Sequence, residues 1–153
     1  CAVLEEDNLK ACFVSHGAHE NNVREIMQWS RQMIGSDGLH LPGKTHPRLY
    51  GTFPRVLGHY VRNEGVISLA EGVRKMTSAP AERLGLKRRG VLRKGNFADI
   101  VLFNPNTVID RATFDDPLLF PDGIPWVFVN GKAVKANGNP TGDLAGRVLR
   151  KTK

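Results

Sequence analysis

The 153 residues of this chain are enough for one ordinary domain but too few for a complete (β/α)8 barrel, which usually needs about 250 residues. Hydrophobic residues make up 41% of the sequence, which allows a real core and argues against a disordered chain. The net charge of +7 first suggests an anionic partner. However, the basic residues form two clusters without aromatic side chains between them, so we expect no nucleic-acid partner.

The cysteine content and the apolar runs bear on the compartment. Two cysteines build no disulfide framework, so reduced thiols in a cytoplasmic protein are the simplest interpretation. No apolar run approaches the roughly 18 residues of a membrane span, and acidic residues stand where a signal peptide would need basic ones. We therefore expect no membrane partner. Because the first residue is Cys1 rather than Met, we interpret the chain as a piece of a longer protein.

The first part of the chain alternates strand and helix patterns. Leu9–Val14 has the composition of a buried strand, Asn21–Trp29 has the apolar spacing of a helix, and Gln32–Gly35 is a second short apolar run. Strand, helix and strand at this spacing predict a βαβ unit with parallel strands. The second strand of that unit would end at Ser36-Asp37-Gly38.

Helices are expected to continue to about residue 86. We predict one near Pro54–Asn63, because proline fits the first turn of a helix. A second helix should begin at the capping box formed by Ser68 and Glu71. A third, Ala81–Leu84, should end at Gly85 in a left-handed conformation.

Strand signals dominate after residue 87. Ala98–Phe103 and Pro125–Val129 are rich in branched and aromatic residues. Asn130-Gly131 is typical of a type I′ turn, so Lys132–Lys135 should return antiparallel to the strand before it. The sequence therefore predicts the end of a βα-repeating domain followed by part of an antiparallel β-domain.

Asp37 and Arg48 are the candidate site residues. Active sites of α/β barrels lie at the C-terminal ends of the strands, where Asp37 would serve as a general base or a metal ligand. Arg48 follows in a loop from the same strand end, and a guanidinium can hold a carboxylate through two parallel hydrogen bonds. The simpler alternative for these residues alone is an Asp that caps a turn and an exposed loop Arg. The five histidines show no HxH or HExxH spacing.

The most specific stretch of the sequence is Ser36-Asp37-Gly38 together with His46–Gly58. It resembles the C-terminal part of N-acyl-D-amino-acid deacylases (D-aminoacylases), which belong to the metal-dependent amidohydrolase superfamily. Gly95–Val101 and Val127–Gly131 also fit, but they are shared widely among amidohydrolases and indicate only the superfamily. The resemblance extends over nearly the whole chain from about residue 9.

The resemblance implies an incomplete α/β architecture. The family combines a (β/α)8 barrel with a small β-sandwich, so this chain would be the C-terminal part of the barrel joined to strands of the sandwich. Residues 1–86 would supply the last strands and helices of the barrel, and residues 87–153 the C-terminal part of the sandwich domain. The remainder of the barrel or another protomer would then cover exposed edges.

The resemblance also implies an activity, the zinc-dependent hydrolysis of the amide bond of small-molecule N-acyl-D-amino acids. Asp37 would take a proton from a metal-bound water and pass it to the leaving nitrogen. It is also a candidate metal ligand. Arg48 would hold the α-carboxylate of the substrate. The other zinc ligands of the family come from earlier barrel strands, so we expect the chain alone to be inactive. The loop Leu39–Thr45 departs from the family pattern, which leaves substrate choice open.

Two alternatives remain. A cyclic-amide hydrolase of the same superfamily, similar to a dihydroorotase or hydantoinase, would not need the His46–Arg48 loop for a free α-carboxylate. A non-enzymatic basic domain would instead bind nucleic acid or another protein through the clusters at Lys87–Lys94 and Arg147–Lys153.

Overall fold

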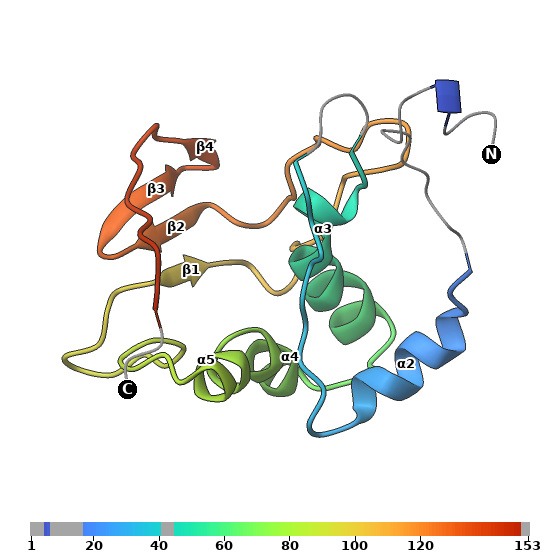
Figure 1. The fold of residues 1–153 in the computed structure, drawn as a ribbon, viewed down its shortest axis with the longest axis horizontal. Coiled ribbons are helices and arrows are strands. Elements are labelled where there is room, and N and C mark those ends of the chain that lie inside the picture. The colour runs from blue at the N-terminus through green and yellow to red at the C-terminus, as the bar shows by residue number, and fades with distance from the viewer. Residues whose placement is uncertain (1–4, 7–16, 41–44, 151–153) are drawn as a thin grey trace.

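Helices gather at one end of the molecule and a small antiparallel sheet at the other (Figure 1). The computed structural model describes residues 5–6, 17–40 and 45–150. In chain order the elements are α2 (Glu20–Gln28), α3 (Arg48–Arg55), the π-helix η1 (Val56–Asn63), α4 (Leu69–Met76), α5 (Ser78–Leu84), β1 (Ile100–Leu102), β2 (Trp126–Val129), β3 (Lys132–Ala136) and β4 (Asn139–Pro140). Of the helices in these described ranges, none is both long enough and apolar enough to cross a bilayer.

Helix α2 confirms the helix predicted at Asn21–Trp29, with its ends shifted by one residue. The His19 side chain begins it by accepting a hydrogen bond from the backbone N–H of Asn21 at 3.3 Å. Met27 is the buried residue of α2 and packs against Val56 and Tyr60 of η1. Ile26 and Trp29, two large apolar residues in and directly after α2, stay exposed.

The strand predicted at Gln32–Gly35 is not formed, and these residues are irregular. The Ile34 N–H donates to the carbonyl of Lys75 in α4 at 3.1 Å, so its backbone partner is a helix rather than a strand. A strand exists only with a neighbour that completes its hydrogen-bond ladder. The other strand of the predicted βαβ unit, Leu9–Val14, lies outside the described residues.

The helix predicted near Pro54–Asn63 starts earlier, at Arg48, and changes from α to π geometry at Val56. Proline lacks the N–H and its ring crowds the carbonyl four residues before it, so Pro54 weakens regular α-helical bonding at this point. The wider η1 buries Val56, Leu57 and Tyr60 against the rest of the helical end.

Helices α4 and α5 follow their local signals. The Ser68 hydroxyl accepts a hydrogen bond from the Glu71 N–H at 3.2 Å, which confirms the predicted start of α4. Gly85 ends α5 with φ +68°, as predicted. The helix starts at Ser78 rather than Ala81, because Ala79 and Pro80 fit its first turn.

The four strands form one antiparallel sheet in the order β1-β2-β3-β4. Val101 pairs with Val127, and a bulge shifts the register between Val127 and Phe128. The β2–β3 turn has φ +51° at Asn130 and φ +82° at Gly131, which confirms the type I′ prediction. β1 is the first edge of this sheet, and its Val101 side chain is 52% exposed.

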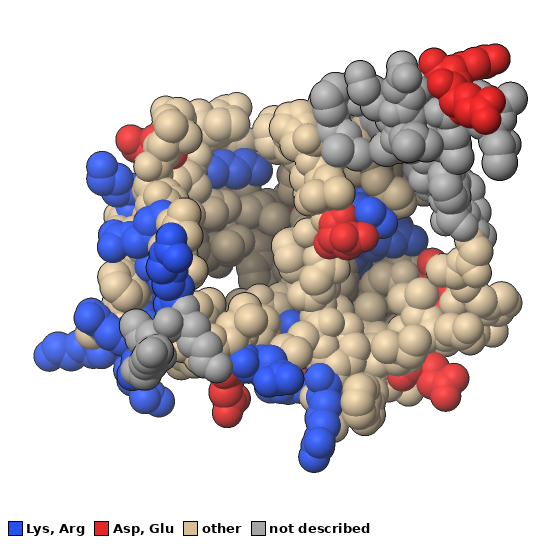
Figure 2. All heavy atoms as spheres, viewed as in Figure 1, with Lys and Arg blue, Asp and Glu red and all other residues tan. Residues whose placement is uncertain are grey.

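An apolar hollow of about 530 Å³ separates the helical end from the sheet. Figure 2 shows it as the recess between the two ends of the molecule. Leu57, Val73 and Met76 line it from the helices, and Val101 and Val127 from the sheet. The core proper is therefore small and sits within the helical end, where Met27, Val56 and Tyr60 form its buried cluster.

Candidate active site around Asp37 and Arg48

The structure brings together the two residues that the sequence singled out. Nη2 of Arg48 lies 2.8 Å from Oδ2 of Asp37, so the two side chains form an ion pair. Asp37 belongs to the irregular segment after α2, and Arg48 is the first residue of α3. The Asp37 side chain is 78% exposed and that of Arg48 39%, so the pair is open to a ligand.

Local hydrogen bonds fix the start of α3 and with it Arg48. The Arg48 N–H donates to Nδ1 of His46 at 3.0 Å, and the Thr52 hydroxyl donates to the Arg48 carbonyl at 2.8 Å. Nε of Arg48 is buried and finds no acceptor among the described residues. Among the described residues, the guanidinium therefore has one donor without an acceptor beside the donor that reaches Asp37.

His46 holds the backbone of Arg48 at the start of α3, a contact that the histidine spacing in the sequence did not predict. Its ring nitrogen accepts from the N–H two residues later, which is the spacing of a side-chain cap. The signal was present in His46-Pro47-Arg48, because a polar side chain that precedes a proline at a helix start is well placed to cap the first free N–H groups.

Close packing explains the sequence Ser36-Asp37-Gly38. Asp37 has φ +47°, a left-handed conformation that few residues other than glycine, asparagine and aspartate adopt readily. A Cβ on Gly38 would come within 2.9 Å of the Leu49 Cα, so only glycine allows the segment to lie against α3. The Ser36 hydroxyl accepts from the Gly38 N–H at 3.3 Å and closes the turn.

The described residues do not by themselves fit a zinc ion. Within residues 5–6, 17–40 and 45–150, no group of three or more His, Cys, Asp or Glu side chains could hold a metal. Zinc in proteins takes three or four protein ligands. Asp37 offers one carboxylate, and one of its oxygens already contacts Arg48. Cys1, Cys12 and His16 lie outside the described residues.

A second polar cluster joins α2 to η1. Glu64 accepts two hydrogen bonds from Arg24, both at 2.8 Å, and lies 3.0 Å from Nε2 of His59. The hydrogen bonds from Arg24 lower the pKa of the Glu64 carboxyl. Because the cluster ties two helices together, we interpret it as structural. The apolar hollow is likewise separate from the candidate site, since neither Asp37 nor Arg48 lines it.

The chain belongs to the amidohydrolase family, whose sequence model matches residues 18–135 and thus includes both Asp37 and Arg48. Among characterised relatives, it is 50% identical to a D-aminoacylase of Alcaligenes xylosoxydans xylosoxydans over 133 residues, 87% of this chain and 28% of the relative. It is 48% identical to an N-acyl-D-glutamate deacylase of the same organism over 86% of this chain and 27% of the relative. These matches confirm the resemblance to D-aminoacylases.

Solved structures give the same answer. A D-aminoacylase crystal structure superposes with a TM-score of 0.83 at 49% identity over 86% of this chain and 28% of its own. The N-acyl-D-glutamate deacylase of Bordetella bronchiseptica, solved with zinc and a phosphonate inhibitor, superposes with a TM-score of 0.74 at 45% identity over 84% of this chain and 28% of its own. These neighbours combine a TIM barrel with a β domain, so the expected fold class is confirmed.

Two further facts limit what is transferred. The chain spans little more than a quarter of the length of these relatives, 27% and 28% for the two deacylases above. A dihydroorotase of Endomicrobium trichonymphae is 45% identical, but over 42 residues only, which is 28% of this chain. The cyclic-amide alternative therefore rests on a much shorter match.

Proposed function

We propose that the protein carrying this chain hydrolyses the amide bond of N-acyl-D-amino acids. The observation that carries the proposal is the identity of 50% and 48% to two deacylases of this kind over 87% and 86% of the chain. The cyclic-amide hydrolase matches only 28% of it. Membership of the amidohydrolase family also favours an enzyme over a non-enzymatic basic domain.

Arg48 is proposed to bind the α-carboxylate of the substrate. Its buried Nε has no acceptor among the described residues, and its Nη2 is held by the exposed Asp37 carboxylate. A substrate carboxylate would supply the missing acceptor and form the parallel pair of hydrogen bonds that guanidinium geometry favours. It would also compete with Asp37 for Arg48.

Asp37 is proposed to transfer the proton. Once the substrate carboxylate occupies Arg48, the Asp37 carboxylate is free to accept a proton from the attacking water and to deliver it to the leaving nitrogen. The substrate is then held at one end by Arg48 while its amide lies beside Asp37. The described residues supply one possible zinc ligand in Asp37, so the role of this chain is proton transfer and substrate binding.

We also propose that the two parts of the chain belong to two domains, residues 1–86 to the barrel and residues 87–153 to the β-sandwich. The described helices from α2 to α5 end at Leu84, and the described strands begin at Ile100. The hollow between them is what separate packing of the two parts would leave.

The test of the function uses the full-length protein loaded with zinc. We expect turnover of N-acetyl-D-methionine, much slower turnover of the L-enantiomer, and none of dihydroorotate. Arg48→Met should raise KM roughly 10- to 100-fold, as the loss of a charge-assisted pair of hydrogen bonds predicts. The matched control is Arg55→Met, since Arg55 leaves the other end of α3 to pair with Asp110.

Hydrolysis of dihydroorotate in place of the linear amide would overturn the proposed function. An Arg48→Met protein whose KM equals that of Arg55→Met would remove Arg48 from the substrate site while leaving the reaction class intact.

A further inference from the structure

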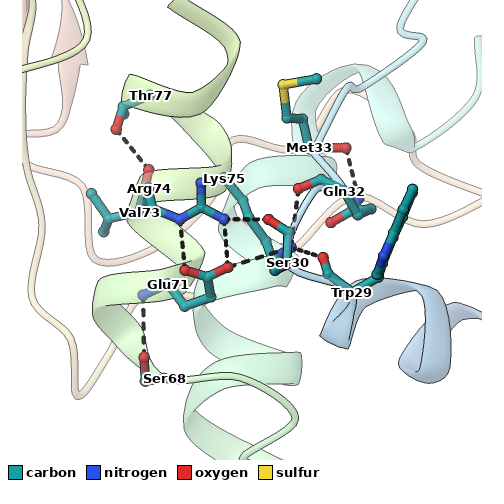
Figure 3. Close-up of polar contacts among 10 residues, drawn as sticks. All are labelled: Trp29, Ser30, Gln32, Met33, Ser68, Glu71, Val73, Arg74, Lys75 and Thr77. Atoms are coloured by element: carbon teal, nitrogen blue, oxygen red, sulfur yellow. Dashed lines mark hydrogen bonds and ion pairs between the residues drawn. The ribbon is translucent and has the colours of Figure 1, made fainter. Parts of the chain in front are cut away.

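Two neighbouring cations of α4, Arg74 and Lys75, bind the backbone that directly follows α2 (Figure 3). Nζ of Lys75 donates to the carbonyls of Trp29 at 2.5 Å and Gln32 at 3.0 Å. Nη2 of Arg74 donates to the carbonyl of Ser30 at 2.7 Å. Three carbonyls within four residues are therefore bound by side chains more than 40 positions further along the chain.

Lys75 is an unusual residue for this purpose, because its side chain has no exposed surface at all. A buried charge is costly unless it is paired and hydrogen-bonded. An ammonium has three N–H donors, and Lys75 has three acceptors, since Oε1 of Glu71 lies 3.5 Å away in addition to the two carbonyls. Glu71 also accepts two hydrogen bonds of 2.7 Å from Arg74, so one carboxylate contacts both cations and neutralises one of their two charges.

The two cations lie at the C-terminal end of α2. The last carbonyls of a helix have no partner within the helix and favour a positive charge nearby. Helix α2 has no basic residue in its last turn. Lys75 and Arg74 place positive charge from α4 at the carbonyl of Trp29, the C-cap of α2, and at the carbonyls of Ser30 and Gln32 just beyond the helix.

The same lysine also holds the backbone close to Asp37. Its carbonyl accepts the Ile34 N–H at 3.1 Å, three residues before Asp37. On the other side of Asp37, Gly38 lies against Leu49 too closely for any side chain. The backbone is therefore held on both sides of Asp37. Lys75 holds the preceding segment through its side chain and its carbonyl, and the contact of Gly38 with Leu49 holds the following one.

We propose that Lys75 is a positioning residue of the deacylase site: it fixes the Trp29–Ile34 backbone and thereby the place where the Asp37 carboxylate meets Arg48. This inference rests on the proposed function, because it assumes that Asp37 transfers the proton. Lys75 acts on Asp37 and not on Arg48, which α3 carries and which His46 and Thr52 hold.

The test is Lys75→Met in the full-length, zinc-loaded protein, since methionine keeps the length of the side chain but donates no hydrogen bond. We expect kcat to fall about 10- to 100-fold, because small misplacement of a reacting group has effects of that size. KM should change less than about twofold, since Arg48 is untouched. Hydrogen–deuterium exchange of peptides covering residues 29–37 should become faster. Lys75→Gln, which keeps two N–H donors, should recover part of kcat.

Ser68→Ala is the matched control, because it weakens the start of the same helix without touching the three carbonyls. It should leave kcat and the exchange of residues 29–37 near wild type. If Lys75→Met does not fold, Arg74→Met removes the Ser30 contact at the helix surface and should show the same pattern with a smaller fall in kcat.

Three results would overturn the inference: wild-type kcat in a folded Lys75→Met protein, an equal loss of kcat in Ser68→Ala, or unchanged exchange of residues 29–37. Failure of the proposed function is seen separately, because the wild-type protein itself would then fail to hydrolyse N-acetyl-D-methionine. In that case the variants are compared on the amide that the wild type does hydrolyse, and the exchange measurement decides independently of activity.

Discussion

At the scale of single residues, Asp37 combines a left-handed backbone with an exposed carboxylate that is paired to Arg48. The left-handed conformation costs roughly 1–2 kcal/mol for most residues and is best tolerated by glycine, asparagine and aspartate. Close contact of Gly38 with Leu49 keeps the segment in place. Conformations of this kind are concentrated at functional sites, where the surrounding packing maintains them.

Asp37→Asn should abolish proton transfer while the protein stays folded. Asparagine tolerates the same φ, and an ion pair this exposed stabilises a protein by about 0–1 kcal/mol at most. We expect kcat of the full-length protein to fall roughly 10²- to 10⁴-fold, with a melting temperature near wild type. Asp37→Ala should lose the same activity but more stability, since alanine is a poorer left-handed residue. Unchanged turnover in a folded Asp37→Asn protein would remove Asp37 from the reaction.

The candidate site was partly readable from the sequence. An Asp between glycines at the end of an apolar run and an Arg in the following loop made Asp37 and Arg48 candidates, and the family resemblance then favoured them over a turn Asp and an exposed loop Arg. Their direct pairing was not predicted, because it depends on how α3 begins. The burial of Lys75 could not be predicted from the sequence either, because its acceptors Trp29 and Gln32 lie 46 and 43 positions away.

At the scale of elements, the features predicted correctly are those set by a few adjacent residues. The Ser68 cap of α4, the Gly85 end of α5 and the Asn130-Gly131 turn each follow from local chemistry. The strand at Gln32–Gly35 was predicted wrongly, because apolar composition alone does not provide the neighbour that a strand needs. Long-range partners therefore decide what local patterns leave undetermined.

The Glu71 carboxylate makes its contacts with Arg74 and Lys75 on α4 sensitive to acid. The hydrogen bonds from Arg74 lower the pKa of Glu71 from 4.5 to about 2. A carboxyl whose pKa is lowered by folding stabilises the fold above its unfolded pKa, and this contribution disappears as pH falls toward the folded value. Wild type should therefore lose stability relative to Glu71→Gln between about pH 4.5 and pH 2. Urea unfolding of both full-length proteins at several pH values measures the difference, and a difference independent of pH would contradict it.

Gly58 controls how η1 packs against the loop after β1. A Cβ at Gly58 would collide with the Val108 carbonyl oxygen and come within 2.6 Å of Cδ1 of Ile109. Val108 is fully buried, and its carbonyl also accepts a hydrogen bond from Arg62 at 2.5 Å, so the loop has little room to move. Gly58→Ala should cost about 1–3 kcal/mol of unfolding free energy in the full-length protein.

The matched control for this change is Gly35→Ala, since nothing lies within 4 Å of a Cβ at Gly35 and its φ is not left-handed. Chemical denaturation should place Gly35→Ala near wild type and Gly58→Ala clearly below it. Equal stability of the two variants would show that η1 and the Val108 loop adjust without cost.

At the scale of the whole molecule, apolar surface remains open where a domain would normally be closed. The hollow of about 530 Å³ lies between the helices and the sheet, and Val101 on the edge strand β1 is 52% exposed. Open apolar strand edges and patches of this kind promote association. The matched part is 28% of the D-aminoacylase and 27% of the N-acyl-D-glutamate deacylase, so most of each relative lies outside it.

The 153-residue chain produced alone should therefore self-associate and show no deacylase activity. Self-association follows from the open edge of β1 and the hollow beside it. Inactivity is expected because the family resemblance places the other zinc ligands in earlier barrel strands, and the described residues of this chain hold no group of three metal-ligating side chains. Light scattering after gel filtration measures the first, and an assay with zinc and N-acetyl-D-methionine measures the second. The full-length protein is the positive control for both.

A lysine on the edge strand β1 tests whether self-association depends on this edge or on the net charge of the chain. Val101→Lys places a charge on β1 and should reduce self-association, as charged residues do on natural sheet edges. Leu144→Lys adds the same charge at a side chain that is 99% exposed and outside the sheet, so it should leave association unchanged. Equal effects of the two substitutions would show that net charge, rather than the open edge of β1, governs association. An isolated wild-type chain that is monomeric and hydrolyses N-acetyl-D-methionine would refute both parts of the prediction for the chain alone.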